Sequence, residues 1–158
     1  MTEPEDPMPA DLPAGRRRPS MVGYTAGIFD LFHVGHLQLL REARRQCDYL
    51  IVGVTADELA VQERGRLPMV PLAERTEVVD GIRFVDRVVP QLTSDLLHAW
   101  ASHRFDVLFV AEHHRGLACW ARAEVELADV GAHVVYLPAT HRRSGELLAR
   151  GFGHAVAD

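Results

Sequence analysis

Short apolar runs alternate with helical segments from residue 21 onward, and this alternation restricts the fold more than any other feature of the sequence. Strands are expected at residues 21–26, 49–54, 87–89, 107–110 and 133–137. Helices are expected at residues 37–45, 57–62, 71–79, 95–102, 120–129 and 144–150. Strands that alternate with helices build βαβ units, and hence a parallel sheet. Because the strand runs are uniformly apolar, helices are expected to cover both faces of that sheet.

The predicted fold class is therefore α/β, a Rossmann-like, doubly wound parallel sheet of five strands in a single domain. A chain of 158 residues suits one domain with one full core. Residues 1–20 are rich in proline and charge and poor in large apolar side chains, which predicts a flexible N-terminal extension. The domain itself is expected over residues 21–150. Residues 151–158 are interpreted as a tail or a linker.

Charge and composition exclude several classes of partner. The net charge of −5 predicts no binding of nucleic acid. No apolar run approaches the ~18–20 residues that span a bilayer, and the N-terminus lacks a signal peptide, so we expect a cytoplasmic protein without membrane contact. Cys47 and Cys119 show no metal-ligand spacing and are interpreted as reduced thiols. All 17 basic residues are arginine, so a phosphate site must use arginine, histidine or backbone N–H groups.

The segment between the first strand and the first helix carries the pattern G-x-F-D-x-x-H-x-G-H, from Gly27 to His36. In an open parallel sheet, ligands bind beyond the carboxyl ends of the strands, and the N–H groups at a helix start favour anions. His33 and His36 are three residues apart and share one side of that helix start. Gly27 and Gly35 allow the backbone to approach a phosphate closely. Asp30 is expected either to cap the helix or to serve the site.

This pattern resembles the signature of the HxGH nucleotidyltransferase superfamily, whose members join a nucleoside monophosphate to an acceptor and release pyrophosphate. Residues 47–58, 82–90 and 134–140 resemble stretches of its cytidylyltransferase branch, which includes the glycerol-3-phosphate and phosphoethanolamine enzymes. The resemblance covers residues 22–150. It implies transfer of CMP from CTP to a small phosphate or phosphonate, with Mg²⁺ bound mainly through the nucleotide. It also implies a homodimer. One similar domain is fused to a phosphonate-forming enzyme, so the resemblance includes possible fusion to another enzyme domain.

The resemblance further implies roles for individual residues. His33 and His36 would be catalytic, binding the nucleotide phosphates and stabilising the transition state. Nucleotide binding is expected from Gly27, Ile28, Phe29, Asp30, Gly35, Glu112, His113, Thr140 and Ser144. Phosphate or acceptor binding is expected from Arg64, Arg66, Arg75, Arg142 and Arg143. No residue is expected to bind a metal ion.

Three departures from the family pattern leave the donor and the acceptor open. Ile28 replaces a threonine of the glycerol-3-phosphate enzymes, Ala111-Glu112-His113-His114 replaces G-D-D-W, and Ala139 with Gly145 replaces an arginine and a hydroxyl-bearing residue. The departures favour a small acceptor such as 2-hydroxyethylphosphonate over glycerol 3-phosphate. One alternative is an adenylyltransferase that uses ATP with the same motif. A second alternative, of a different class, is a non-catalytic nucleotide-binding regulatory domain.

Overall fold

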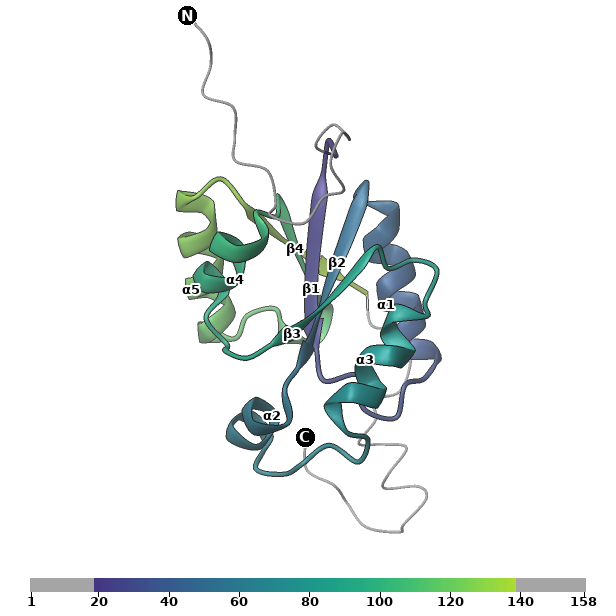
Figure 1. The fold of residues 1–158 in the computed structure, drawn as a ribbon. Coiled ribbons are helices and arrows are strands. Elements are labelled where there is room, and N and C mark those ends of the chain that lie inside the picture. The colour runs from purple at the N-terminus through teal and green to yellow at the C-terminus, as the bar shows by residue number, and fades with distance from the viewer. Residues whose placement is uncertain (1–18, 139–158) are drawn as a thin grey trace, which may run out of the picture.

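The computed structural model describes residues 19–138, which form a five-stranded parallel sheet between two layers of helices (Figure 1). The strands are β1 (Val22–Gly27), β2 (Tyr49–Thr55), β3 (Arg87–Gln91), β4 (Val107–Ala111) and β5 (His133–Leu137). The helices are α1 (Val34–Arg45), α2 (Asp57–Arg64), α3 (Leu72–Asp80), α4 (Leu96–His103) and α5 (Ala118–Asp129), and a 3₁₀ turn, η1, spans Glu112–His114. The predicted fold class is confirmed.

The strand order is β3-β2-β1-β4-β5, and every neighbouring pair is parallel. β1 lies at the centre, and pairs with β2 along its whole length, from Val22 opposite Tyr49 to Gly27 opposite Val54. After β3, which pairs with β2, the chain crosses to the other side of β1 and forms β4 and β5. The hydroxyl of the buried Thr25 donates to the carbonyl of Phe109 at 3.0 Å and joins β1 to β4.

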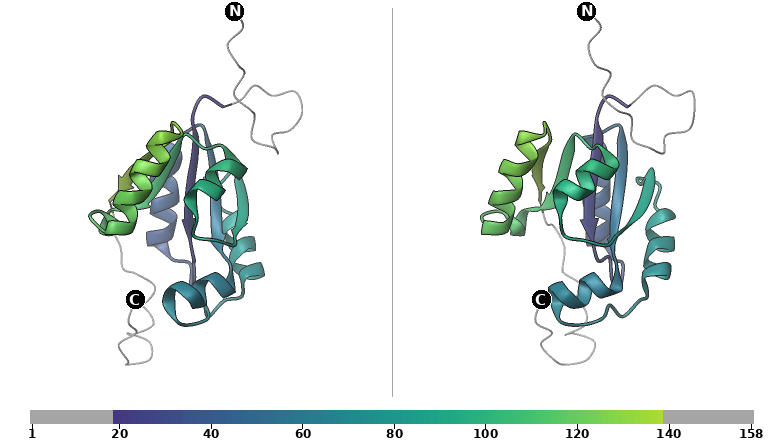
Figure 2. Two further views of the ribbon diagram at one scale, coloured as in Figure 1. Left: turned by 90° about the vertical axis from the view of Figure 1, so that its left-hand side faces the viewer. Right: turned by 60° about the vertical axis from the view of Figure 1, so that its left-hand side comes forward.

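Helices cover both faces of the sheet, as the uniformly apolar strands predict. α1 and α3 pack on one face, and α4 and α5 pack on the other (Figure 2). In β2, Leu50 and Val52 point into the core under α1 and α3, whereas Ile51 between them points into the core under α4 and α5. Each such side chain contributes about 1.5–3 kcal/mol through its burial. Because both faces of such a strand are buried, its sequence does not alternate between apolar and polar residues.

Element bounds differ from the prediction mainly at helix starts. α1 begins three residues early, at Val34, because His33 caps it through its side chain. α5 begins at Ala118 rather than at residue 120, and Pro71 lies just before α3 instead of forming its first residue. The predicted helix at residues 144–150, most of the predicted extension and the predicted tail lie outside the described residues. Within residues 19–138, no helix is long and apolar enough to cross a membrane.

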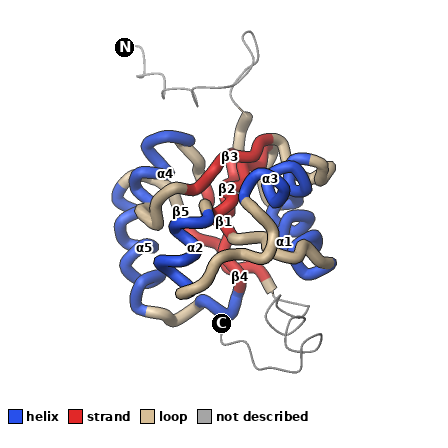
Figure 3. The backbone as a smooth tube through the Cα atoms, turned by 60° about the horizontal axis from the view of Figure 1, so that its bottom comes forward, coloured by secondary structure: helices blue, strands red, loops and turns tan. Residues whose placement is uncertain are grey.

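The strand order determines where a ligand can bind. From β1 the chain continues to β2 and β3 on one side of β1, and it then continues to β4 and β5 on the other side. The strand order therefore reverses between β1 and β4. In sheets of this kind ligands bind outside the carboxyl ends of the strands at this switch point. α2 follows the carboxyl end of β2, and Figure 3 shows α2 and the loop after it crossing this edge of the sheet.

Candidate functional site

The loop between β1 and α1, residues 28–33, has an unusual backbone. Phe29 and Leu31 have φ angles of 53° and 48°, which side chains larger than asparagine rarely adopt. Such strain persists only where the surrounding structure enforces it, and it gathers at functional sites. The loop follows the central strand at the switch point, so both topology and strain indicate the site that the motif predicts.

His33 and His36 form a reciprocal cap at the start of α1. The Nδ1 atom of His33 accepts from the backbone N–H of Gly35 at 3.0 Å, and the Nδ1 atom of His36 accepts from the backbone N–H of His33 at 3.3 Å. The two rings lie 4.0 Å apart between centroids. A neutral imidazole that accepts at Nδ1 carries its proton at Nε2. The cap therefore sets the tautomer of both rings, with Nε2–H as the donor.

His36 lies in an aromatic environment that keeps its ring neutral. The ring packs edge-on against Phe29 at 5.4 Å and against Phe32 at 5.2 Å between centroids. Burial, followed by the nearby charge of His33, lowers the pKa of His36 to about 4. At neutral pH, His36 is thus a hydrogen-bond donor without a net charge.

Phe29 and Asp30 take positions that narrow their predicted roles. The Phe29 side chain is buried and packs against His36, so only the backbone of this residue is available to a nucleotide. Asp30 does not cap α1, because His33 occupies that position. Instead, the Asp30 carboxylate accepts from the backbone N–H groups of Met69 and Val70, at 2.8 and 3.0 Å. Asp30 therefore joins the motif loop to the segment before α3.

Arg75, for which phosphate binding is predicted, is buried at the same edge of the sheet. It lies in α3 with 1% of its surface exposed, and its guanidinium donates to three backbone carbonyls and to the Asp57 carboxylate. One of these carbonyls belongs to Ile28, in the motif loop. Four N–H donors of Arg75 are thus directed at the protein, and its predicted contact with phosphate stays a prediction. Nothing in the local sequence around Arg75 or Asp57 indicates the contact between these two residues.

The remaining predicted residues of the described part lie around the same edge. Arg64 ends α2, and Arg66 follows Gly65, whose φ of 75° ends the helix; both arginines are exposed. On the other side of the switch point, Glu112 and His113 follow β4 in η1. Arg115 donates to the Glu112 carboxylate through two nitrogens, at 2.6 and 3.0 Å, so this carboxylate already has a cationic partner.

Part of the predicted site lies beyond the described residues. This part comprises Thr140, Arg142, Arg143 and Ser144. The predicted roles of these four residues stay predictions. Within residues 19–138, no group of three or more histidine, cysteine, aspartate or glutamate side chains could hold a metal ion.

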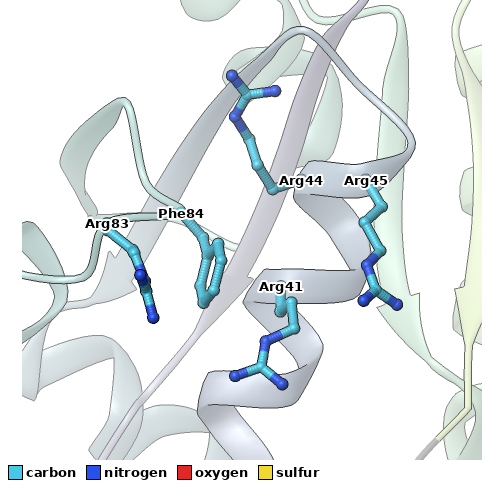
Figure 4. A pocket seen from close by; sticks show the side chains of 5 residues that line it. All are labelled: Arg41, Arg44, Arg45, Arg83 and Phe84. Carbon is cyan, nitrogen blue, oxygen red and sulfur yellow. The ribbon is translucent and has the colours of Figure 1, made fainter.

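A separate cavity of about 390 Å³ lies at the opposite edge of the sheet (Figure 4). Arg41, Arg44 and Arg45 line it from the last turns of α1, which ends near the amino end of β2. Arg83 and Phe84 line it from the loop between α3 and β3, and the guanidinium groups of Arg41 and Arg83 lie 5.3 and 5.5 Å from the Phe84 ring. This cavity contains none of the motif residues.

The family of the chain follows from comparison with known proteins. Residues 24–145 match the model of the family described as cytidylyltransferase-like. The chain belongs to the cytidylyltransferase-like family. It is 28% identical to an FAD synthase of Thermococcus sibiricus over 130 residues, which are 75% of this chain and 80% of that protein. The predicted resemblance to the nucleotidyltransferase superfamily is confirmed, and these relatives support an enzyme.

Other relatives match shorter parts of the chain. An FAD synthase of Pyrococcus abyssi is 45% identical over 76 residues, 48% of this chain and 50% of that protein. An ethanolamine-phosphate cytidylyltransferase of Arabidopsis thaliana is 36% identical over 91 residues, 58% of this chain and 21% of that protein. The chain thus spans half or less of these two relatives.

Solved structures support the same fold. A lipopolysaccharide core biosynthesis protein of Thermoplasma volcanium superposes with a TM-score of 0.65 at 20% identity, covering 78% of this chain and 98% of that one. A pantothenate synthetase of Thermus thermophilus gives a TM-score of 0.57 at 15% identity, covering 79% of this chain and 58% of that one.

Proposed function

We propose that the protein transfers CMP from CTP to a small phosphate or phosphonate and releases pyrophosphate. The observation that carries this proposal is the reciprocal cap of His33 and His36, located at the switch point between β1 and β4. It combines the amino end of a helix with two imidazoles of set tautomer. Such an arrangement suits the phosphates of a nucleotide.

The reaction needs charge stabilisation more than covalent help from the protein. An oxygen of the acceptor attacks the α-phosphorus of CTP, and the bond from that phosphorus to the oxygen bridging to the β-phosphorus breaks. The negative charge that moves onto the phosphate oxygens would be met by the Nε2–H groups of His33 and His36 and by the amino end of α1. Both rings donate without first having to bind a proton, because their Nδ1 atoms already accept from the backbone.

Mg²⁺ belongs to this proposal as an ion that the nucleotide carries. The described residues form no group of three metal ligands, and they suit an Mg²⁺ ion that is held by the triphosphate. Its chemistry would be to neutralise charge on the leaving pyrophosphate. A homodimer and fusion to another enzyme domain stay predictions.

The first test of the proposal concerns the nucleotide. We expect CTP to bind more tightly than ATP and GTP, and to support pyrophosphate release with a phosphate acceptor. The reason is the family match over residues 24–145 together with the cytidylyltransferase-like stretches at residues 47–58 and 82–90. Calorimetric titration with each nucleotide, in the presence of Mg²⁺, measures the preference. ATP binding as tight as CTP binding contradicts the choice of CTP.

Adenylyl transfer is the second candidate, and the FAD synthase relatives favour it. FAD contains an adenylyl group, and two FAD synthases are among the relatives, at 28% identity over 130 residues and at 45% identity over 76 residues. The Ala111–His114 segment after β4 also departs from the G-D-D-W of the cytidylyl branch. If ATP is preferred, an assay with FMN as the acceptor separates flavin adenylylation from transfer to a simple phosphate.

The second test concerns the acceptor. We expect a short acceptor, such as 2-hydroxyethylphosphonate, to react faster than glycerol 3-phosphate. Ile28 offers no hydroxyl at a position where the glycerol-3-phosphate enzymes have one, and Ala139 and Gly145, outside the described residues, have lost polar side chains. Each buried hydroxyl without a partner costs roughly 1–3 kcal/mol, or about 5- to 150-fold in rate. Parallel pyrophosphate-release assays should include phosphoethanolamine and phosphocholine, and faster reaction of glycerol 3-phosphate contradicts the prediction.

A further inference from the structure

Arg75 is the only buried charged residue among residues 19–138. Removing a guanidinium from water is costly unless its hydrogen bonds are replaced and its charge is compensated. Arg75 meets both conditions, and it does so at the edge of the sheet that carries the candidate site. Because four of its N–H donors are directed at the protein, its position calls for an explanation besides phosphate binding.

The guanidinium of Arg75 donates to four acceptors in three separate segments of the chain. Nη1 donates to the carbonyl of Ile28 at 2.6 Å and to the carbonyl of Thr55 at 2.8 Å. Nε donates to the carbonyl of Val70 at 2.8 Å, and Nη2 donates to the Asp57 carboxylate at 2.5 Å. The motif loop, the junction between β2 and α2, and the segment before α3 are thereby held by one side chain.

Asp30 makes a second connection between two of these segments. Its carboxylate accepts from the N–H groups of Met69 and Val70, so Val70 is held through its N–H by Asp30 and through its carbonyl by Arg75. Residues 65–71 connect α2 to α3 and include the exposed Arg66. The segment is thus anchored to the motif loop at its end nearest α3, and Arg66 lies near its other end, beside α2.

We propose that Arg75, with Asp57 as its counter-ion, is a positioning residue that holds Arg66 and the motif loop in register for the transfer reaction. It acts through the carbonyls of Ile28 and Val70 and does not touch the nucleotide. The inference rests on the proposed function and on the predicted contact of Arg66 with the phosphates. A lysine cannot replace Arg75, because one ammonium has three donors on a single atom and the four acceptors lie around a planar fork.

The test is a double-mutant cycle of kcat with Arg75→Lys and Arg66→Ala. We expect each single variant to lower kcat on the order of 10- to 100-fold, because a misplacement of about 1 Å can cost that much. In the double variant, we expect a loss no larger than that of Arg75→Lys alone, since Arg66 is already misplaced. A merely structural role of Arg75 predicts that the two losses multiply, and that result overturns the inference.

The same cycle distinguishes failure of the inference from failure of the proposed function. An Arg66→Ala variant with full kcat contradicts the role of Arg66 at the phosphates and overturns the inference, while the transfer it performs supports the proposed function. A parent protein without measurable transfer contradicts the proposed function. Two clear single losses that multiply contradict only the positioning role. Should Arg75→Lys not fold, as judged by circular dichroism, the cycle is run with Asp57→Asn, which keeps an oxygen acceptor but removes the counter-charge.

Arg44→Lys is the matched control. Arg44 also joins a carbonyl and a carboxylate, donating to the carbonyl of Cys47 at 2.7 Å and lying 3.1 Å from the Asp86 carboxylate. It does so at the opposite edge of the sheet (Figure 4). We expect Arg44→Lys to leave kcat within about twofold of the parent protein. A loss equal to that of Arg75→Lys would show that any arginine bridge in this fold has the same effect, and would overturn the inference.

Discussion

Replacement of His36 with alanine is expected to lower the rate of nucleotidyl transfer by a factor of about 10²–10³ while the fold survives. The variant removes a neutral Nε2–H donor that lies at the amino end of α1, beside His33. It also removes the acceptor for the backbone N–H of His33, which is one half of the reciprocal cap. Pyrophosphate release under saturating nucleotide measures the first loss, and denaturant unfolding measures the second.

A His36→Gln variant separates these two losses. Glutamine at the third helical position can accept from the capping residue's N–H, as it does in ordinary capping boxes. We expect His36→Gln to recover most of the stability that His36→Ala loses, about 0.5–2 kcal/mol, and to recover little of the rate. Near-normal activity of either variant would show that His36 has no part in the chemistry. Activity that follows stability from one variant to the other would show that the cap alone matters.

The protein is also expected to lose stability as the pH falls from 6.5 to about 4, and His36 is expected to be a main cause. Burial beside Phe29 and Phe32, with a smaller contribution from His33, lowers the pKa of His36 to about 4. Between these pH values the unfolded chain binds a proton at this position and the folded chain does not. The free energy of unfolding therefore decreases as pH falls through this window, by up to roughly 3 kcal/mol, and stops changing on this account below pH 4.

Urea unfolding at pH 7 and at pH 4.5, for the parent protein and for His36→Gln, measures this contribution. Glutamine does not titrate, so the variant should lose less stability between the two pH values than the parent does. His98→Gln, at an exposed position on α4, is the matched control and should behave like the parent. An equal decrease in the parent and in His36→Gln would contradict the assignment of the acid sensitivity to His36.

The motif loop shows how far local sequence reasoning extends. Gly27, His33, Gly35 and His36 are recognisable because their spacing is short and their types are unusual together. The loop's strain at Phe29 and Leu31 is not recognisable, because neither residue type indicates a positive φ. The same limit applies to Asp30, which was expected either to cap the adjacent helix or to serve the site, and whose carboxylate accepts from a segment about 40 residues away.

The sequence by itself determined the alternating fold class and the motif at the end of the first strand, because both depend on residue types a few positions apart. Apolar runs with two buried faces and a histidine pair at a helix start are local patterns, and local patterns are legible without coordinates. Only the tertiary structure decided the contacts of Arg75. Its partners Ile28, Thr55 and Asp57 lie 47, 20 and 18 residues away. The order of the strands brings these partners to one edge of the sheet. A guanidinium that is buried there must donate its hydrogen bonds to protein groups, because it has left water.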